Sequence, residues 1–426
     1  MQLVAYGAQD IYLTGNPQIT FFKVVYRRHT NFSIETIAQT FNSDVDFGKK
    51  SQVTIARNGD LIGAMHLEMK VQELQQKPGT SSYVSWTNGL GNAMVKSISI
   101  EIGGQEIDKH YGEWLDIWGE LNVKKDHRDA YDAMVGNTYT TDDADPADSA
   151  VGSAVTLYVP LRFWFNRNPG LALPLIALQY HEVKLHLELE ESKFLVRSDV
   201  AVTDPKNSGG TEGVKVSSCN LLVDYIYLDT DERRRFAQVS HEYLIEQLQH
   251  TGSESITSGT TNVNVDLNFN HPVKCLNWTI QDTTYSTVGS GPGTDTVRRN
   301  GGNQKLRYSC LTASGNKYDT FESGKIQLNG HDRMSERDSD YFRLVQNVQH
   351  MEVAPTKTIY TYSFGLKPAE HQPSGTCNFS RIDNAKLNLK FTSNPHTNNA
   401  TELKVYATNY NVLRIMSGMG GLAYSN

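Results

Sequence analysis

Long apolar runs are absent from this 426-residue sequence. No stretch approaches the roughly 18–20 consecutive apolar residues that a membrane-spanning helix requires. Near the N-terminus, polar residues interrupt every apolar run: Gln9, Asp10, Thr14, Asn16 and Gln18. A secretion signal needs an uninterrupted apolar stretch of about 7–15 residues. We therefore expect a soluble protein that is synthesised in the cytoplasm.

Basic residues are too few for a protein that binds nucleic acid mainly by charge. The chain has 40 Lys and Arg residues against 47 Asp and Glu residues, which gives a formal net charge of −7. Attraction to phosphate groups requires an excess of positive charge. We therefore expect no direct contact with nucleic acid as the main activity.

Cysteines are also scarce, and no Cys-x-x-Cys motif occurs. The four cysteines lie far apart in the sequence, at Cys219, Cys275, Cys310 and Cys377. This spacing indicates neither a structural zinc site nor a dense disulfide framework. We expect each cysteine to be a small buried apolar residue in a reducing compartment.

Motifs for catalysis and cofactor binding are missing as well. The segment GSGPGTDT lacks the Lys-Ser/Thr pair of a phosphate-binding loop, and no Gly-x-Ser-x-Gly sequence occurs. The acidic segment TTDDADPADS lacks the ligand spacing of an EF-hand loop. The histidines do not form the His-x-His pattern of jelly-roll metal enzymes. We expect no catalytic residues, no metal and no cofactor.

Two alternatives stay open from the residues alone. One is a glycan-processing hydrolase with two carboxylates in a cleft between two domains, about 5–5.5 Å apart for a retaining mechanism. Glu188, Glu190 and Asp224 are the first candidates for such a pair. The other alternative is a lectin-like binding module, which needs an aromatic-lined groove. The tryptophans, however, fall in strand and helix patterns that predict core positions.

Short alternating strands dominate the sequence. Residues 181–190 (HEVKLHLELE) place Val or Leu at every second position, with charged residues between them. This period of two predicts a half-buried strand. The same alternation occurs in NLLVDYIYLD, VNVDLNFN, AKLNLKF and ELKVYATNY. Helical patterns are few, and the clearest is GEWLDIWGEL at 112–121. The chain is therefore predicted to be all-β with a few short helices.

The sequence contains an internal repeat. Residues 99–121 and 325–348 both read as a strand, a glycine turn, a polar segment and a short apolar helix. In these helices, Trp114, Leu115, Trp118 and Leu121 align with Tyr341, Phe342, Val345 and Val348. Three further pairs of segments align in the same order: 53–58 with 265–270, 181–189 with 383–391, and 224–234 with 405–414, where Tyr225 meets Tyr406. The order of these matches predicts two copies of one β domain.

Each copy has about eight strands, which suits a jelly roll of two Greek keys. We predict an all-β fold of two tandem eight-stranded jelly-roll sandwiches with short helices in the connections. The predicted boundaries are an N-terminal arm at 1–29, a first jelly roll at 30–228, a linker at 229–240 and a second jelly roll at 241–426.

The linker carries the densest charge cluster, DTDERRRFAQ. One interpretation is a basic phosphate site. The simpler interpretation is the end of a strand whose arginines pair with the adjacent Asp229, Asp231 and Glu232. We favour the second interpretation, because the acidic residues balance the arginines.

The N-terminal arm is aromatic and ends in a basic pair. Its candidate contact residues are Tyr6, Tyr12, Phe21, Phe22, Tyr26, Arg27 and Arg28. A β block with a peripheral arm suits closed, symmetric assembly, so we interpret the arm as an assembly segment. The candidate glycosylation sequons include Asn277, Asn378 and Asn399.

Long segments of the chain, in order, resemble the major capsid proteins of the nucleocytoplasmic large DNA viruses. They are GAQDIYLTGNPQITFFKVVYRRHTNF, VPLRFWFNRNPGLALPLIALQYHEVKL, DYIYLDTDERRRFA and ATNYNVLRIMSGMGGLAYSN. The resemblance covers essentially the whole chain. It implies the double jelly-roll fold, with the jelly rolls perpendicular to a shell, and a structural rather than an enzymatic function.

The resemblance also implies partners. Three chains would form a homotrimer with a pseudo-hexagonal outline, because three doubled domains present six similar units. These capsomers would contact neighbouring capsomers and tile an icosahedral virion shell over an internal membrane, without insertion into it. The arm would lie at the base, near minor capsid and penton proteins. A late protein of this kind would be synthesised and assembled in the host cytoplasm.

Overall fold

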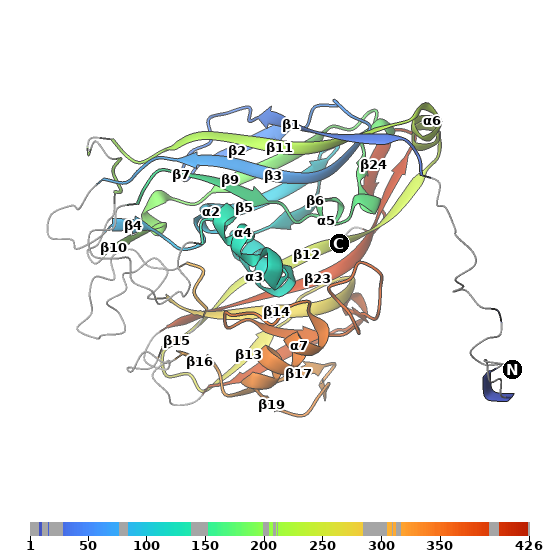
Figure 1. Cartoon of the computed structure of the whole chain (residues 1–426). Coiled ribbons are helices and arrows are strands. Elements are labelled where there is room, and N and C mark those ends of the chain that lie inside the picture. The colour runs from blue at the N-terminus through green and yellow to red at the C-terminus, as the bar shows by residue number, and fades with distance from the viewer. Residues whose placement is uncertain are drawn as a thin grey trace, which may run out of the picture.

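The computed structural model describes residues 8–10, 16, 29–75, 84–137, 152–198, 204–207, 210, 212–283, 305–308, 310–311, 317–391 and 400–424. Within them, antiparallel strands form two sandwiches that stack one above the other (Figure 1). Short helices lie between and beside the sandwiches (Figure 1).

The first sandwich consists of two sheets. One has the order β1 (Phe32–Thr40), β11 (Val216–Leu228), β3 (Leu61–Val71) and β7 (Val155–Pro160), with β8 (Leu173–Pro174) also paired to β3. The other has the order β2 (Lys50–Thr54), β9 (Val183–Leu189), β5 (Val95–Ile102) and β6 (Gln105–His110). A short separate ladder joins β4 (Val84–Trp86) to β10 (Val196–Ser198).

The second sandwich repeats this plan. One sheet has the order β12 (His241–Ile256), β23 (Thr401–Met416), β14 (Pro272–Asp282) and β20 (Tyr360–Ser363), with β21 (Cys377–Asn378) and β24 (Met419–Leu422) at its margins. The other has the order β13 (Asn262–Asp266), β22 (Ala385–Lys390), β17 (Ser323–Leu328) and β18 (His331–Asp332), with β19 (Arg337–Asp338) also paired to β17. A small ladder joins β15 (Cys310–Leu311) to β16 (Lys317–Tyr318).

The two sandwiches have matching strand topology. Each sandwich has eight main strands once the short extra strands are set aside. If these eight are numbered in chain order, one sheet has the order 1-8-3-6 and the other has the order 2-7-4-5, in both sandwiches. This is the jelly-roll arrangement, in which each sheet combines strands from both ends of the domain. The predicted all-β fold of two tandem jelly rolls is therefore confirmed.

Alternation along the strands forms both cores. In β9, the residues at every second position, such as Val183 and Leu185, are buried, and the residues between them are partly exposed. In β22, Leu387 and Leu389 are buried in the same way. The two core clusters are largely separate, but Ile245, Leu413 and Ile415 of the second half belong to the first core.

Helices occupy the connections. The α-helices are α2 (Leu90–Met94), α3 (Gly112–Asn122), α4 (Lys125–Val135), α5 (Trp164–Arg167), α6 (Thr230–Gln238) and α7 (Gln346–His350). A π-helical turn, η6 (Tyr341–Val345), runs directly into α7. The short 3₁₀ turns are η1 (Ala8–Asp10), η2 (Pro169–Leu171), η3 (Leu175–Ala177), η4 (Ser192–Phe194) and η7 (Phe379–Arg381). The repeated helices predicted from the sequence are α3 and η6–α7.

One predicted alignment within the repeat is wrong by one residue. Tyr225 lies in the first core, and its hydroxyl donates to the Ala56 carbonyl at 2.7 Å. Tyr406, its predicted match, faces the opposite way and contacts the first sandwich. In β11, Val223 and Tyr225 face the first core, whereas in β23 the core-facing residues are Val405 and Ala407, on either side of Tyr406. A shift of one residue moves a side chain to the other face of a sheet, so the two tyrosines are not equivalent.

The predicted linker contains the helix α6. The carboxylate of Asp229 accepts a hydrogen bond from the Thr230 amide at 2.7 Å, which caps the helix. Arg233 pairs with Asp60 of the first sandwich, with Nε to Oδ1 at 3.0 Å. The predicted pairing with adjacent acidic residues is therefore wrong for Arg233, because the helix directs its side chain toward the first sandwich.

The close approach of α3 to α2 yields a stability prediction. A Cβ on Gly112 would lie 2.1 Å from the Asn92 carbonyl oxygen and 2.3 Å from that of Val95. Both are backbone atoms, so Gly112→Ala should lower the free energy of unfolding by about 2–3 kcal/mol. The midpoint of thermal unfolding measures this. Gly213→Ala is the matched control, because nothing lies within 4 Å of that position. Equal midpoints for the two variants would contradict the packing described.

Candidate functional site: the interface between the sandwiches

Apolar side chains of α3 pack on the second sandwich. The cluster, here called the inter-sandwich interface, consists of Trp114, Ile117 and Leu121 of α3 with Tyr308, Ile359 and Tyr406 of the second sandwich. The ring centroids of Trp114 and Tyr406 are 5.7 Å apart, and His250 stacks on Tyr406 at 4.5 Å. Aromatic packing therefore joins the two jelly rolls directly.

Three acidic residues of α3 bind the second sandwich beside this cluster. Glu113 pairs with Lys404, with Oε1 to Nζ at 2.6 Å, and accepts from the Tyr406 hydroxyl at 3.1 Å. Asp116 pairs with Lys357 at 2.8 Å. The third, Glu120, has two partners, described next. Each carboxylate is buried, so each pairing fixes the position of the helix on the second sandwich.

Glu120 joins three segments. Its Oε2 accepts hydrogen bonds from the Thr356 amide at 3.1 Å and from the Thr356 hydroxyl at 2.9 Å. Its Oε1 pairs with Arg128 of α4 at 2.5 Å. Burial disfavours the ionised carboxylate, but Lys357 and Arg128 outweigh burial and hold the pKa of Glu120 below its usual range. Burial likewise disfavours the ionised form of Glu113, but Lys404 outweighs burial and holds the pKa of Glu113 below its usual range.

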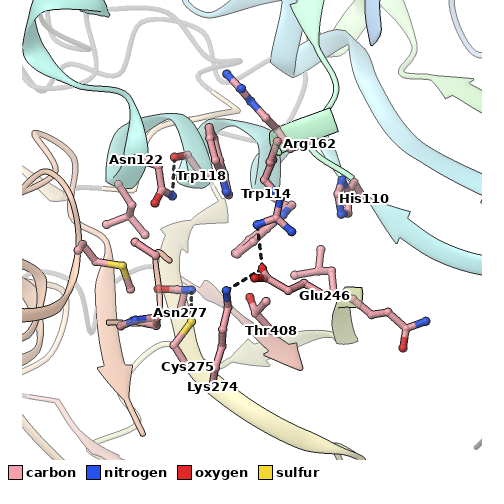
Figure 2. Close-up of a pocket in the computed structure, with 17 residues that line it drawn as sticks. His110, Trp114, Trp118, Asn122, Arg162, Glu246, Lys274, Cys275, Asn277 and Thr408 are labelled. Atoms are coloured by element: carbon pink, nitrogen blue, oxygen red, sulfur yellow. Dashed lines mark hydrogen bonds and ion pairs between the residues drawn. The ribbon is translucent and has the colours of Figure 1, made fainter. Parts of the chain in front are cut away.

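A second group of charges surrounds Glu246 of β12. Its carboxylate pairs with Arg167 of α5 at 2.9 Å and with Lys274 of β14 at 2.6 Å, and His371 lies at 3.5 Å. Figure 2 shows Lys274 and Glu246 pointing toward each other. Burial disfavours ionisation, but Arg167 and Lys274 outweigh it and hold the pKa of Glu246 far below its usual range.

A small cavity lies against these charges. It has a volume of about 30 Å³ and is lined by both sandwiches, including Trp118 and Arg162 from the first and Glu246 and Lys274 from the second (Figure 2). The guanidinium of Arg162 stacks on the Trp118 ring at 4.1 Å. A cavity of this size holds one or two water molecules. It is too small for a sugar or another organic substrate.

The carboxylates considered for hydrolysis do not converge. Glu188 pairs with Lys96 at 2.8 Å and with Lys50 at 3.4 Å, while Glu190 pairs with Lys305 of the second sandwich. Asp224 lies in the other sheet of the first sandwich and accepts from the Thr36 hydroxyl. Each of these carboxylates contacts a different partner, so they do not form the acid–base pair of a glycan hydrolase.

The described residues also lack two further features, a cluster of metal ligands and a membrane-spanning helix. Within the described ranges, no group of three or more His, Cys, Asp or Glu side chains is arranged to hold a metal ion. No helix in that part of the chain is long and apolar enough to cross a membrane.

The predicted arm and glycosylation residues have different positions. The arm residues Tyr6, Tyr12, Phe21, Phe22, Tyr26, Arg27 and Arg28, as well as Asn399, lie outside the described residues. Asn277 is buried in β14, and its side-chain oxygen accepts from the Thr361 hydroxyl at 2.9 Å. Asn378 is exposed and caps η7 by accepting from the Ser380 amide. A glycan on Asn277 does not fit the folded chain, whereas Asn378 is accessible.

The sequence interpretation missed the acidic residues of α3. Glu113, Asp116 and Glu120 are three and four positions apart, so they share one side of the helix. The signal was present in GEWLDIWGEL, where acidic residues interrupt apolar ones around the whole helix. A helix without a fully polar face is one that is buried on more than one side.

Comparison with known families agrees with this architecture. Residues 20–229 match a family described as the major capsid protein N-terminus. Residues 232–421 match the large eukaryotic DNA virus major capsid protein family. The chain belongs to this major capsid protein family. The junction between the two matches falls at the start of α6.

Curated relatives match the capsid chain along its full length. The major capsid protein of Pyramimonas orientalis virus is 50% identical and that of Paramecium bursaria Chlorella virus 1 is 46% identical. In both comparisons the alignment covers 100% of this chain and 99% of the relative. The chain is thus a structural major capsid protein, a component of the virion capsid rather than an enzyme.

Solved structures show the same fold. The crystal structure of PBCV-1 VP54, fitted into a reconstruction of the virophage Sputnik, has a TM-score of 0.77 and 40% identity, covering 96% of this chain and 100% of that one. The Faustovirus major capsid protein has a TM-score of 0.74 at 12% identity, covering 96% and 94%. The second likeness concerns the fold alone.

The buried charges predict a large loss of stability for this capsid protein on removal of one partner. Glu246→Gln leaves Lys274 and Arg167 without their counter-charge, so the free energy of unfolding should fall by about 3–5 kcal/mol. Denaturant or thermal unfolding measures the change. Glu242→Gln in the same strand removes an exposed pair with Arg414 and should cost at most about 0.5 kcal/mol. A small loss for both variants would contradict the role assigned to Glu246.

The same carboxylates predict a pH dependence. The pKa values of Glu113, Glu120 and Glu246 are lower in the folded chain than the ordinary value near 4.5. Their contribution to stability is therefore present above about pH 4.5 and lost as the pH falls toward the folded-state pKa. Unfolding midpoints measured across pH should fall in acid, and the difference between wild type and Glu246→Gln should shrink there. A constant difference would refute this linkage.

Proposed function

We propose that the chain forms a homotrimeric capsomer with a pseudo-hexagonal outline, which tiles an icosahedral virion shell over an internal membrane. The observation that carries the proposal is the repeated jelly-roll topology within one chain. Three such chains present six similar sandwiches around one axis. The buried inter-sandwich contacts support the proposal, because they make each chain a single block rather than two mobile domains.

The remaining partners follow from this arrangement. The capsomers contact neighbouring capsomers, and the N-terminal arm lies at the base, near minor capsid and penton proteins. Its aromatic residues pack against neighbours, and Arg27 and Arg28 meet acidic partners. The internal membrane lies nearby without insertion of the chain. The net charge of −7 agrees with a shell that does not contact nucleic acid.

We also propose the domain boundaries and the place of synthesis. The arm comprises 1–29, the first jelly roll 30–228, the linker 229–240 and the second jelly roll 241–426. The chain is a late product, synthesised and assembled in the host cytoplasm. Among the candidate glycosylation sites, exposure favours Asn378 over the buried Asn277.

The mass of the purified chain in solution tests the capsomer. Light scattering at several concentrations should give a stable species of three times 47.7 kDa. A self-sufficient capsomer should form this species without added partners. A well-folded monomer at every concentration would contradict a self-sufficient trimer.

A further inference from the structure

Positive charge exceeds negative charge around the small cavity between the sandwiches, here called the inter-sandwich cavity. Its lining includes Arg162 and Arg167 from the first sandwich and Lys274 from the second. Within the described residues, Glu246 is the one carboxylate of the lining. A single carboxylate cannot neutralise three cations, so the charge of the cavity is unbalanced.

The nearby histidines do not remove this surplus. His110 also lines the cavity and pairs with Asp108, with Nε2 to Oδ2 at 2.9 Å. With His110 neutral and Asp108 counted, three positive charges meet two negative charges, which leaves a surplus of one (3 − 2). His371, which lies 3.5 Å from Glu246, is either neutral or positive and adds no negative charge.

Arg162 has no counter-charge of its own. Its guanidinium lies over the rings of Trp118 and Tyr131, at 4.1 and 5.9 Å, and Figure 2 shows it directed away from Glu246. Among the described residues, no carboxylate forms an ion pair with Arg162. Burial, reinforced by the charge of Arg167, lowers the pKa of Arg162, as expected for a cation without a partner.

Hydrogen-bond donors at the cavity also lack acceptors. The Nε atoms of Arg162 and Arg167 are buried and have no acceptor among the described residues. The side chain of Lys274 is 4% exposed, and an ammonium group only donates. The side-chain oxygen of Asn277, which also lines the cavity, already accepts from the Thr361 hydroxyl. Because a buried donor without an acceptor is costly, a group that only accepts is favoured here.

The size of the cavity selects a monatomic ion. Its volume of about 30 Å³ suits an occupant of the size of a water molecule. A chloride ion is only slightly larger than water, whereas sulfate and phosphate are too large. Trp118 and Leu121 supply apolar parts of the lining, and attraction between charges is stronger where little water screens it.

We propose that the inter-sandwich cavity binds one chloride ion, which accepts hydrogen bonds from Lys274 and Arg167 and balances the charge of Arg162. Both sandwiches supply the donors, so the site is complete only when the two jelly rolls are docked. An ion that binds this arrangement and not the unfolded chain stabilises it by mass action. The ion thus adds a further link between the sandwiches beside the contacts of α3.

Urea unfolding tests the site, with sodium chloride replaced stepwise by sodium gluconate at constant ionic strength. Gluconate is too large for the cavity, and urea adds no halide, unlike guanidinium chloride. Above the dissociation constant, each tenfold rise in chloride should raise the folding equilibrium constant of each chain by about tenfold. Equal stability at every ratio of the two salts would overturn the proposal.

Two charge variants test the position of the ion, with opposite expected signs. Arg162→Met removes the unpaired charge and should weaken chloride binding by roughly tenfold, whereas Glu246→Gln removes a negative charge and should tighten it. Arg414→Met is the matched control, because Arg414 is exposed and pairs with Glu242, so the chloride dependence should stay that of wild type. An unchanged dependence in both Arg162→Met and Glu246→Gln would place the ion elsewhere and refute the site.

Bromide locates the ion in the wild-type chain, so this measurement does not depend on the folding of a variant. Crystals of the full chain in sodium bromide should show an anomalous diffraction peak in the inter-sandwich cavity, within hydrogen-bonding distance of the Lys274 ammonium. Absence of this peak, at a bromide concentration that stabilises the chain in urea, would contradict the proposal. Neither result depends on the proposed trimer, because the cavity lies within one chain.

Discussion

The burial of helix α3 between two sandwiches is the constraint on which the rest of the chain depends. One side of the helix contributes Leu115 to the first core, and another side contributes Trp114, Ile117 and Leu121 to the contact with the second sandwich. A helix that is buried on two sides fixes the distance and angle between the sandwiches. Because protein interiors are close-packed, such a contact transmits displacement instead of absorbing it.

Charge makes this contact specific. An apolar helix surface alone tolerates sliding, whereas Glu113 must meet Lys404 and Asp116 must meet Lys357, since each is buried. A buried ion pair adds little net stability, but its loss or misalignment is costly. The carboxylates of α3 therefore select one arrangement of the two jelly rolls. A capsid subunit requires this selection, because an error in the angle within one chain would be repeated around a shell.

The sequence predicted the parts of the structure that depend on local pattern. Alternation identified strands such as β9 and β22, and the repeated hairpin and helix identified the duplication. The partners of Glu113 and Glu246 were not predictable, because they are distant in sequence and belong to strands whose packing is set by the whole fold. The slip between Tyr225 and Tyr406 arose because both strands carry several tyrosines near the matched position, and the sequence pattern does not show that Val405 and Ala407, not Tyr406, face the second core.

The duplication did not preserve the charges of the helix, and this difference explains how two similar helices avoid competing for one surface. At the positions of Glu113, Asp116 and Glu120, the second helix has Asp340, Arg343 and Asn347. Placed on the surface that α3 occupies, Arg343 would face Lys357, and Asn347 would replace the carboxylate that accepts two hydrogen bonds from Thr356. Repulsion of this kind gives specificity by penalising the wrong partner. The apolar positions are thus repeated in both helices, and the charges restrict this surface of the second sandwich to α3.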